Sequence, residues 1–192
     1  MDHPNRQGTL RELFLSLDDD QNNDDLLMFI LESGIVTGVL DLVTTSSSEF
    51  RGPPPRPYSI DQLYLLKSKW VTLEHLLAMD IKRIFLNRSP LTCQEINTFL
   101  KKWIDGECSK RIKQLYVEMK NEVNYDVLME GIEVNRRDPN LKRKYVSYDS
   151  VEKIFGGLDV RRKEDGAMAT IIDDDEGLKI LFWPDYKGNP YY

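Results

Sequence analysis

Three six-residue segments of the chain share one pattern of apolar positions. They read IDQLYL at 60–65, IKRIFL at 81–86 and IKQLYV at 112–117, each with aliphatic residues at the first, fourth and sixth positions and polar or aromatic residues between them. This form, LxxLxL, is typical of the strand in a leucine-rich repeat. The pattern therefore predicts three strands that belong to one repeated unit.

Each of these hexads is followed by a predicted helix. The clearest helix lies at 93–105, where Thr92 and Glu95 form a capping box and the apolar residues recur at helical spacing. Shorter apolar stripes predict helices at 72–79 and 125–130. The hexads start 21 and 31 residues apart, which suits strand–helix units joined by loops of variable length. Chance similarity in a chain rich in Leu and Ile is the alternative, and the helices between the hexads favour a true repeat.

Such units would stack into a layered structure. Neither a strand nor an amphipathic helix buries its apolar side alone, so we expect a short parallel sheet with helices on one flank. A looser strand is predicted at 36–43, after a helix over Asp24–Ser33. One more helix is predicted near the N-terminus, because Thr9 and Glu12 have capping-box spacing ahead of Leu13.

The last third of the chain follows a different period. GLDVRR, AMATIID and LKILFW alternate with the turn dipeptides Asp165-Gly166 and Glu176-Gly177, a pattern that predicts an antiparallel meander. The predicted fold class is therefore α/β, with short leucine-rich-repeat-like strand–helix units and parallel strands, followed by a C-terminal antiparallel β meander.

Composition along the chain predicts four parts. The Pro- and Ser-rich stretch at 44–59 is typical of a linker. Pro54 and Pro57 have PxxP spacing that would suit an SH3 or WW groove, although a loop is the simpler interpretation. We predict an N-terminal helical arm with one strand at 1–43, the linker at 44–59, the main domain at 60–184 and a flexible tail at 185–192.

The charge balance limits the choice of partners. The 192 residues are 41% hydrophobic and 30% charged, as in soluble globular proteins. A net charge of −6 and a pI of about 5.1 argue against nucleic-acid binding, which needs clustered Lys and Arg. The stretch 136–144 is the exception, with five positive residues and one negative residue. We predict a docking patch there for an acidic protein partner, with a solvated loop as the alternative. The candidate partner-binding residues are Arg136, Arg137, Lys142, Arg143 and Lys144.

Candidate groups for catalysis or metal binding are few. The two histidines, His3 and His75, are far apart in the sequence, and no nucleophile or phosphate-binding motif occurs. The acidic run at 18–25 has EF-hand spacing at three positions but lacks the glycine and the twelfth-position glutamate, and the run DDDE at 173–176 is typical of a solvated turn. We therefore expect no enzyme, no cofactor and no metal site. A divalent-metal hydrolase that uses these acidic runs is the remote alternative.

Three further features complete the sequence picture. Trp103 lies on the apolar face of the predicted helix, so we expect core packing for it rather than a recognition patch. Cys93 and Cys108 lack CxxC spacing, which is typical of free thiols in a reducing compartment. Neither a signal peptide nor a membrane-spanning apolar run is visible, so we expect a cytoplasmic or nuclear protein without a membrane partner.

Several sequence blocks resemble one protein family. WVTLEHLLAMD from Trp70, LTCQEINTFLKKWIDG from Leu91, the helix end at Leu128–Gly131 and GGLDVRRKEDGAMATI from Gly156 occur in the expected order. Together they resemble the nematode F-box-associated domain of the second type, from about Ile60 to Trp183. The resemblance implies that an N-terminal F-box engages the Skp adaptor of a cullin-based ubiquitin ligase, while the associated domain recruits the substrate.

The start of the chain departs from that layout. Residues 1–57 lack the Leu-Pro opening of an F-box and contain the acidic arm and the linker instead. A truncated paralogue, an incomplete gene prediction and a free-standing recognition domain are the alternatives, and the adaptor and cullin are expected partners only if an F-box is present or supplied. The predicted function is a non-catalytic module that recruits a protein substrate to such a ligase, with a free-standing or sequestering binding domain as the alternative.

Overall fold

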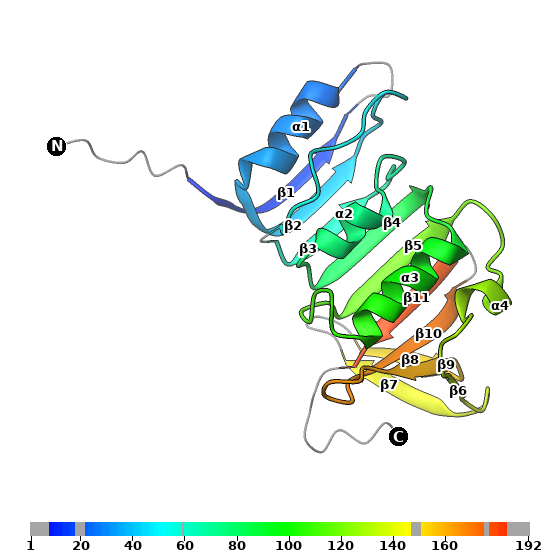
Figure 1. The fold of residues 1–192 in the computed structure, drawn as a ribbon. Coiled ribbons are helices and arrows are strands. Elements are labelled where there is room, and N and C mark those ends of the chain that lie inside the picture. Colours follow the sequence, from blue (N-terminus) through cyan, green and yellow to red (C-terminus); the bar gives the residue numbers. More distant parts are fainter. Residues whose placement is uncertain (1–7, 18–21, 59, 147–150, 175–176, 184–192) are drawn as a thin grey trace.

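The computed structural model describes residues 8–17, 22–58, 60–146, 151–174 and 177–183. Within these residues, four helices lie along one face of a nine-stranded sheet, and a two-stranded sheet packs at one end of the opposite face (Figure 1). The helices are α1 (Asp24–Ser33), α2 (Leu73–Ala78), α3 (Cys93–Ile104) and α4 (Tyr125–Leu128). The large sheet contains, in spatial order, β1 (Leu10–Ser16), β2 (Val36–Val43), β3 (Gln62–Leu65), β4 (Arg83–Ser89), β5 (Gln114–Met119), β11 (Gly177–Phe182), β10 (Met168–Asp174), β9 (Leu158–Arg161) and β6 (Asn135–Arg136). The small sheet pairs β7 (Lys142–Val146) with β8 (Val151–Phe155).

The large sheet has a parallel half and an antiparallel half. The four pairings from β1 to β5 are parallel. The four pairings from β5 through β11, β10 and β9 to β6 are antiparallel. The last of the described strands, β11, therefore lies near the centre of the sheet against β5. The predicted meander is confirmed, since β9, β10 and β11 pair in sequence order.

The three hexads lie side by side, as predicted. Leu63 pairs with Ile84 and Ile84 with Leu115, so the fourth positions form one row across β3, β4 and β5. The sixth positions of the hexads form a second row, two residues further along the strands. Both rows are buried in the core beneath the helices. The prediction of parallel strand–helix units is confirmed in part, because α2 and α4 are short and the second half of the sheet is antiparallel.

The helices begin where the sequence signals placed them. In α3, the Thr92 hydroxyl oxygen accepts from the Glu95 amide at 3.3 Å, and the Glu95 carboxylate accepts from the Thr92 amide at 2.8 Å. This reciprocal pair satisfies two amides at the start of the helix that have no intrahelical partner. Trp103 is 2% exposed, so the predicted core position is confirmed.

The N-terminal helix predicted from Thr9 and Glu12 is wrong. Residues Leu10–Ser16 form β1, which pairs in parallel with β2 at the edge of the sheet. Leu13 and Leu15 pack against the core, and this period of two fits a strand better than a helix. Capping-box spacing without a longer apolar stripe was too weak a signal to predict a helix.

Residues 44–58 pack against the rest of the molecule. Phe50 and Tyr58 are buried in the main hydrophobic core, and the Ser47 amide donates to the Asp24 carboxylate of α1 at 2.9 Å. Nε2 of the buried His75 lies 2.9 Å from the Pro53 carbonyl oxygen, which ties this segment to α2. The division into four parts stays a prediction, and its tail at 185–192 lies outside the described residues.

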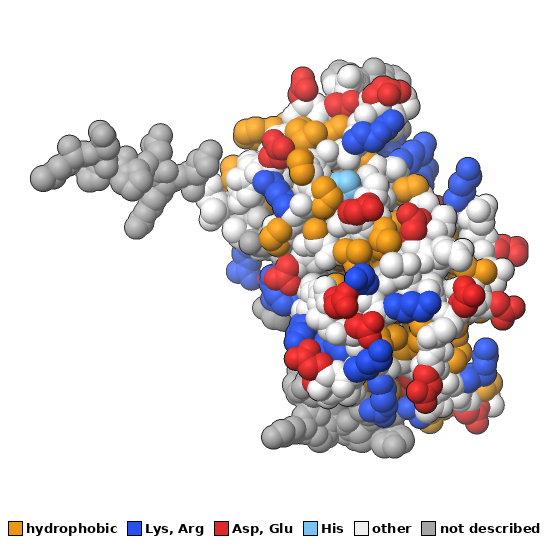
Figure 2. Space-filling view, in the orientation of Figure 1, with side chains coloured by type: hydrophobic (Ala, Val, Ile, Leu, Met, Phe, Trp, Pro, Cys, Tyr) orange, Lys and Arg blue, Asp and Glu red, His pale blue; other side chains and the backbone are white. Residues whose placement is uncertain are grey.

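The stretch 136–144 is part strand and part loop, since residues 137–141 connect two strands. Arg136 belongs to β6, and Lys142–Lys144 begin β7, where inward and outward side chains alternate. On the helix-covered face, Lys and Arg side chains are intermingled with Asp and Glu side chains (Figure 2). No helix within the described part of the chain is long and apolar enough to cross a membrane.

Candidate functional site

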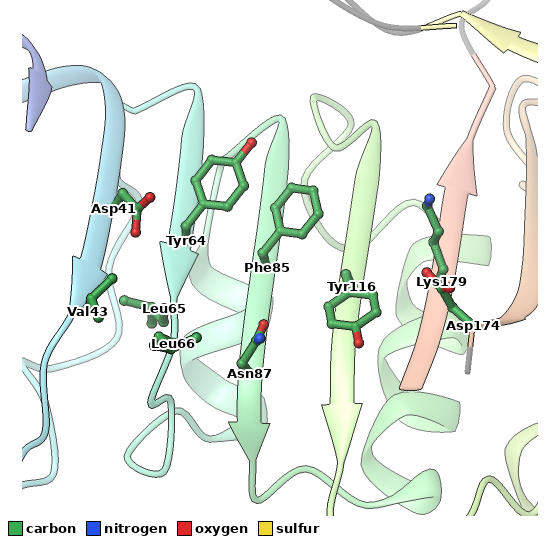
Figure 3. Close-up of a pocket in the computed structure, with 10 residues that line it drawn as sticks. All are labelled: Asp41, Val43, Tyr64, Leu65, Leu66, Phe85, Asn87, Tyr116, Asp174 and Lys179. Atoms are coloured by element: carbon green, nitrogen blue, oxygen red, sulfur yellow. The ribbon is translucent and has the colours of Figure 1, made fainter. Parts of the chain in front are cut away.

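One side chain from each hexad lies on the face of the sheet opposite the helices. Tyr64, Phe85 and Tyr116 occupy the fifth position of the three hexads, between the two buried aliphatic positions. Tyr64 pairs with Phe85 and Phe85 with Tyr116, so the three rings form a row across β3, β4 and β5 (Figure 3). We call these three residues the aromatic row.

The rings of the aromatic row contact one another. The centroids of Tyr64 and Phe85 are 4.5 Å apart with an interplanar angle of 10°, a stacked pair. Phe85 and Tyr116 are 6.2 Å apart and tilted by 32°. The Tyr64 hydroxyl donates to the Gln62 side-chain oxygen at 2.9 Å, which fixes the orientation of its ring. All three side chains are half-buried, so the row offers a rigid apolar surface that still reaches solvent.

Charged residues stand at both ends of the aromatic row. Asp41 of β2 pairs with Tyr64, and Lys179 of β11 pairs with Tyr116. With Asp174 and neighbouring residues they line a hollow of about 500 Å³ (Figure 3). The lining residues are Asp41, Val43, Tyr64, Leu65, Leu66, Phe85, Asn87, Tyr116, Asp174 and Lys179.

The two ends differ in how their charge is compensated. The Lys179 ammonium pairs with the Glu152 carboxylate of β8 at 2.5 Å. Asp41 has neither an ion pair nor a side-chain hydrogen bond among the described residues, and burial raises its pKa. The hollow therefore contains two carboxylates, Asp41 and Asp174, and one ammonium group that is already paired.

The antiparallel half of the same face is covered. The two strands β7 and β8 pack over β10 and β11 through a second hydrophobic cluster. The cluster contains Tyr145, Ile154, Met168, Leu181 and Trp183, with Ile172 packed against it. This cover stops beside the aromatic row, where Glu152 meets Lys179.

A buried ion pair anchors the cover. Nη1 of Arg143 donates to both carboxylate oxygens of Asp159 at 3.0 Å, and Nη2 donates to the Gly156 carbonyl at 2.6 Å. The Thr170 hydroxyl donates to the same carboxylate at 2.6 Å and accepts from the Trp183 indole at 2.7 Å. Arg143 and Asp159 are 1% exposed at their side chains, so their charges are compensated inside the protein.

The predicted partner-binding residues are therefore not equivalent. Arg143 is buried in the ion pair with Asp159, and Arg137 donates to the same carboxylate at 2.5 Å. Arg136, Lys142 and Lys144 are exposed. The structure does not bring all five side chains onto one surface. Whether the exposed three bind a partner stays a prediction.

The acidic runs have few described members. Residues 18–21 and 175–176 lie outside the described part, Asp24 accepts from Ser47, and Asp173 and Asp174 are exposed at the end of β10. Among the residues described, no group of three or more His, Cys, Asp or Glu side chains could hold a metal ion.

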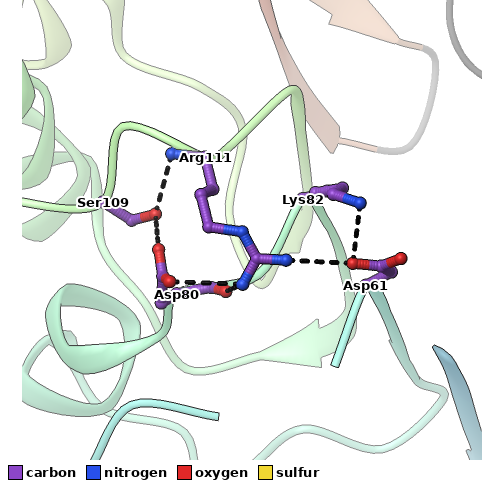
Figure 4. A network of polar contacts seen from close by, with 5 residues as sticks. All are labelled: Asp61, Asp80, Lys82, Ser109 and Arg111. Atoms are coloured by element: carbon purple, nitrogen blue, oxygen red, sulfur yellow. Dashed lines mark hydrogen bonds and ion pairs between the residues drawn. The ribbon is translucent and has the colours of Figure 1, made fainter. Parts of the chain in front are cut away.

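A second polar cluster lies at the opposite end of the parallel strands, where each hexad begins. Arg111 donates to Asp80 at 3.2 Å and to Asp61 at 3.0 Å, and Lys82 pairs with Asp61 at 2.8 Å (Figure 4). Ser109 donates to the other Asp80 oxygen at 2.5 Å. These contacts join the segments that enter β3, β4 and β5, which makes a structural role sufficient to explain them.

Sequence reasoning identified the strands that carry the aromatic row but not the row itself. The signal was present, since the fifth position of every hexad is Tyr or Phe. Residues one strand apart in a parallel sheet lie on the same face when they are in register, and the register became known only from the structure. Asp41 and Lys179 come from strands outside the hexads and gave no signal of their own.

One comparison with known proteins matches the segment that carries the aromatic row. A family profile described as F-box associated matches residues 57–117, which include all three members of the aromatic row. The uncharacterized protein F59B2.9 of Caenorhabditis elegans is 24% identical over 131 residues, which cover 65% of this chain and 30% of that protein. The uncharacterized protein F59B2.8 of the same nematode is 22% identical over 134 residues, with the same coverage of 65% and 30%.

A third relative has a descriptive name. The E3 ubiquitin-protein ligase hecw-1 of C. elegans is 30% identical over 76 residues, which cover 40% of this chain but 6% of that protein. The chain thus spans about 30% or less of the length of the relatives it matches. No solved structure matches the chain. Residues 57–117 thus match the profile of the F-box-associated family.

Proposed function

We propose that this chain is a protein-recognition module that binds its partner through the aromatic row. The F-box-associated family is a family of protein-interaction domains, and the matched segment runs from the approach to β3 through Val117 of β5. The observation that carries the proposal is the alignment of Tyr64, Phe85 and Tyr116 in register on a half-exposed face. Tyr and other aromatic side chains are enriched in binding surfaces because they supply large contact areas at low entropic cost.

The match to the F-box-associated profile supports a role for the module. In the context of an F-box protein, a recognition domain recruits the substrate, and the bound substrate is held near a charged conjugating enzyme without any covalent step on this chain. Strand–helix units that resemble leucine-rich repeats fit the same proposal, since such repeats commonly carry binding surfaces on one face. The proposal also places the protein in the cytoplasm or the nucleus. A free-standing module that sequesters its partner is the alternative, because the partial match to a ubiquitin ligase is indirect.

Proximity labelling in nematode cells tests the surface. Phe85→Glu places a charge in the middle of the aromatic row, and we expect the labelled partner set to be lost while the protein stays folded. The matched control neutralises the exposed basic residues, with Arg136, Lys142 and Lys144 all changed to Gln. Loss of partners in this control but not in Phe85→Glu would overturn the proposal in favour of the basic patch.

Co-purification with the Skp adaptor tests the ligase context separately. Binding of the complete protein to the adaptor would support substrate recruitment. Failure to bind, with partner labelling still dependent on Phe85, would favour the sequestering role.

A further inference from the structure

Asp41 is a carboxylate of the open face that stands between two aromatic side chains. It pairs with Phe14 of β1 on one side and with Tyr64 of β3 on the other. In-register residues of neighbouring parallel strands share a face and lie about 4.8 Å apart across the sheet. Leu13, Leu15, Leu40 and Leu42 point into the core, so Phe14 and Asp41 point to the open face.

The surroundings of Asp41 lack a compensating charge. Among the described residues, no cation and no hydrogen-bond donor contacts its side chain, although the residue is half-buried. Burial also raises the pKa of this carboxyl, as expected for a carboxylate that has lost water without gaining a partner. Phe14 is 65% exposed, so its ring is accessible to a ligand.

A carboxylate between aromatic rings is suited to bind a cation. Ammonium and guanidinium groups are attracted to the faces of aromatic rings, and a carboxylate adds a charge-assisted hydrogen bond. Tyr64 is held by its stacking on Phe85 and by its hydrogen bond to Gln62, so the ring is fixed before binding. The hollow beside Asp41 is also negative, since Lys179 is paired with Glu152 and Asp174 is exposed.

We propose that Phe14, Asp41 and Tyr64 form a pocket for a Lys or Arg side chain of the protein partner. The inference rests on the proposed function and specifies the partner, because the aromatic row then takes the apolar residues next to that basic residue. The bound segment is extended and lies across the strands, with its basic residue over β2.

The spacing of the sheet sets the sequence of the bound segment. Tyr116 is three strands from Asp41, or about 14 Å. An extended peptide rises about 3.3 Å per residue and directs alternate side chains to one face. A basic residue at position i and apolar residues at i+2 and i+4, or the same order reversed, therefore match Asp41, the Tyr64–Phe85 pair and Tyr116.

A random array of nine-residue peptides, probed with the complete chain, tests this specificity. We expect the selected peptides to be enriched in Lys or Arg two residues from an apolar residue. Replacing that basic residue by Gln should weaken binding to the wild type by about tenfold. The same replacement should have little effect on binding to Asp41→Asn. An equal loss in both proteins would overturn the pocket.

Two variants separate this inference from the proposed function. Glu12→Gln removes a carboxylate of the neighbouring strand β1, and we expect it to retain the preference for basic peptides, whereas loss of the preference would indicate general electrostatics instead of a pocket. Asp41→Asn should unfold at the same temperature as the wild type or higher, because it removes an unpaired charge. A lower unfolding temperature would assign Asp41 a structural role.

The aromatic row itself has a distinct outcome. If selected peptides depend on Phe85 but carry no basic residue, the pocket is wrong and the proposed function stands. If selected peptides bind Phe85→Ala as tightly as the wild type, or if the wild type selects no peptide, both proposals fail.

Discussion

The two halves of the large sheet share one hydrophobic core but differ on the opposite face. In the parallel half, β1 to β5 leave that face to the aromatic row, with Phe14 and Asp41 beside it. In the antiparallel half, β7 and β8 cover the face over β10 and β11 and enclose a second, smaller core. The same sheet therefore has a closed end and an open end.

The two halves place their polar groups differently. The closed end buries Arg143, Asp159 and Thr170, and both Arg143 and Thr170 donate hydrogen bonds to the Asp159 carboxylate. The open end keeps Asp41 half-buried and without a partner of its own among the described residues. A buried ion pair whose opposite charges compensate each other serves the fold, whereas an unpaired carboxylate beside solvent is available to a ligand. Substitutions at the two ends should accordingly change different quantities.

The largest loss of stability is expected at the closed end. Arg143→Met removes one partner of a buried ion pair and leaves the Asp159 carboxylate with less compensation, which should lower the free energy of unfolding by about 3–5 kcal/mol. Urea denaturation followed by tryptophan fluorescence measures this. Lys144→Met is the matched control. Lys144 follows Arg143 in β7 and is exposed, so its substitution should change stability by less than about 0.5 kcal/mol. Equal effects would show that the cover is not anchored by Arg143.

Two neighbours on β3 distinguish the two faces of the open end. Leu63 is 1% exposed in the core, and Leu63→Ala should cost about 2–5 kcal/mol of stability. Tyr64 lies on the open face, and Tyr64→Ala should cost about 1 kcal/mol or less, chiefly through its contact with Phe85. Thermal unfolding of both variants provides the comparison. A larger loss for Tyr64→Ala would mean that the aromatic row is structural, which would weaken its assignment as a binding surface.

The sequence predicted those helices and strands whose apolar pattern and caps lie within a single element. The hexads and α3 carry their apolar positions and caps in consecutive residues, and both were predicted correctly. β7 was missed because its inward residues are Arg143 and Tyr145, so a charged side chain interrupts the expected apolar alternation. The burial of Arg143 depends on Asp159, sixteen residues away, and no local pattern contains that partner.

Only part of the candidate site could be predicted from the sequence, for a related reason. The aromatic residues repeat with the hexads, so their strands could be placed. Phe14 and Asp41 meet Tyr64 only because β1 and β2 extend the sheet, and β1 was predicted as a helix. A site assembled from separate strands requires the strand order, which the sequence of any one strand does not contain.

A smaller, pH-dependent loss is expected from Tyr145→Phe at the closed end. The Tyr145 hydroxyl donates to the Lys113 carbonyl at 2.5 Å, and its loss should cost about 1 kcal/mol at neutral pH. Burial raises the pKa of Tyr145 above its ordinary value of about 10. The folded state then binds its proton more tightly than the unfolded state, so stability is complete below about pH 10 and falls as the pH rises further.

Thermal unfolding between pH 8 and pH 11 measures this dependence. The decline above about pH 10 should be shallower in Tyr145→Phe than in the wild type. Some decline should remain in the variant, because burial also raises the pKa of Cys108 to about 11 and that of Tyr125 to about 12. Identical slopes in the two proteins would show that Tyr145 is not protected from solvent by the cover.

The smallest effect is expected at the polar cluster that joins the hexads (Figure 4). The side chain of Arg111 is 40% exposed, and the side chains of its partners Asp61 and Asp80 are each 42% exposed. Solvent screens such pairs, so Arg111→Ala should lower stability by about 1 kcal/mol or less, and 1 M NaCl should reduce the difference from the wild type.

Acid titration separates the cluster from a general salt effect. The hydrogen bond from Ser109 is the largest influence on the pKa of Asp80 and lowers it; burial opposes this, and the hydrogen bond and charge of Arg111 add to the lowering. A carboxyl whose pKa is lower in the folded state contributes stability above its ordinary pKa, and this contribution is lost as the pH falls through the lower value. Ser109→Ala should therefore flatten the loss of stability below about pH 4 more than Lys82→Ala, because Lys82 contacts Asp61 and not Asp80. If Lys82→Ala flattens the profile equally, the acid sensitivity belongs to the whole charged cluster. Screened charges, rather than the hydrogen bond from Ser109, would then join the segments that enter β3, β4 and β5.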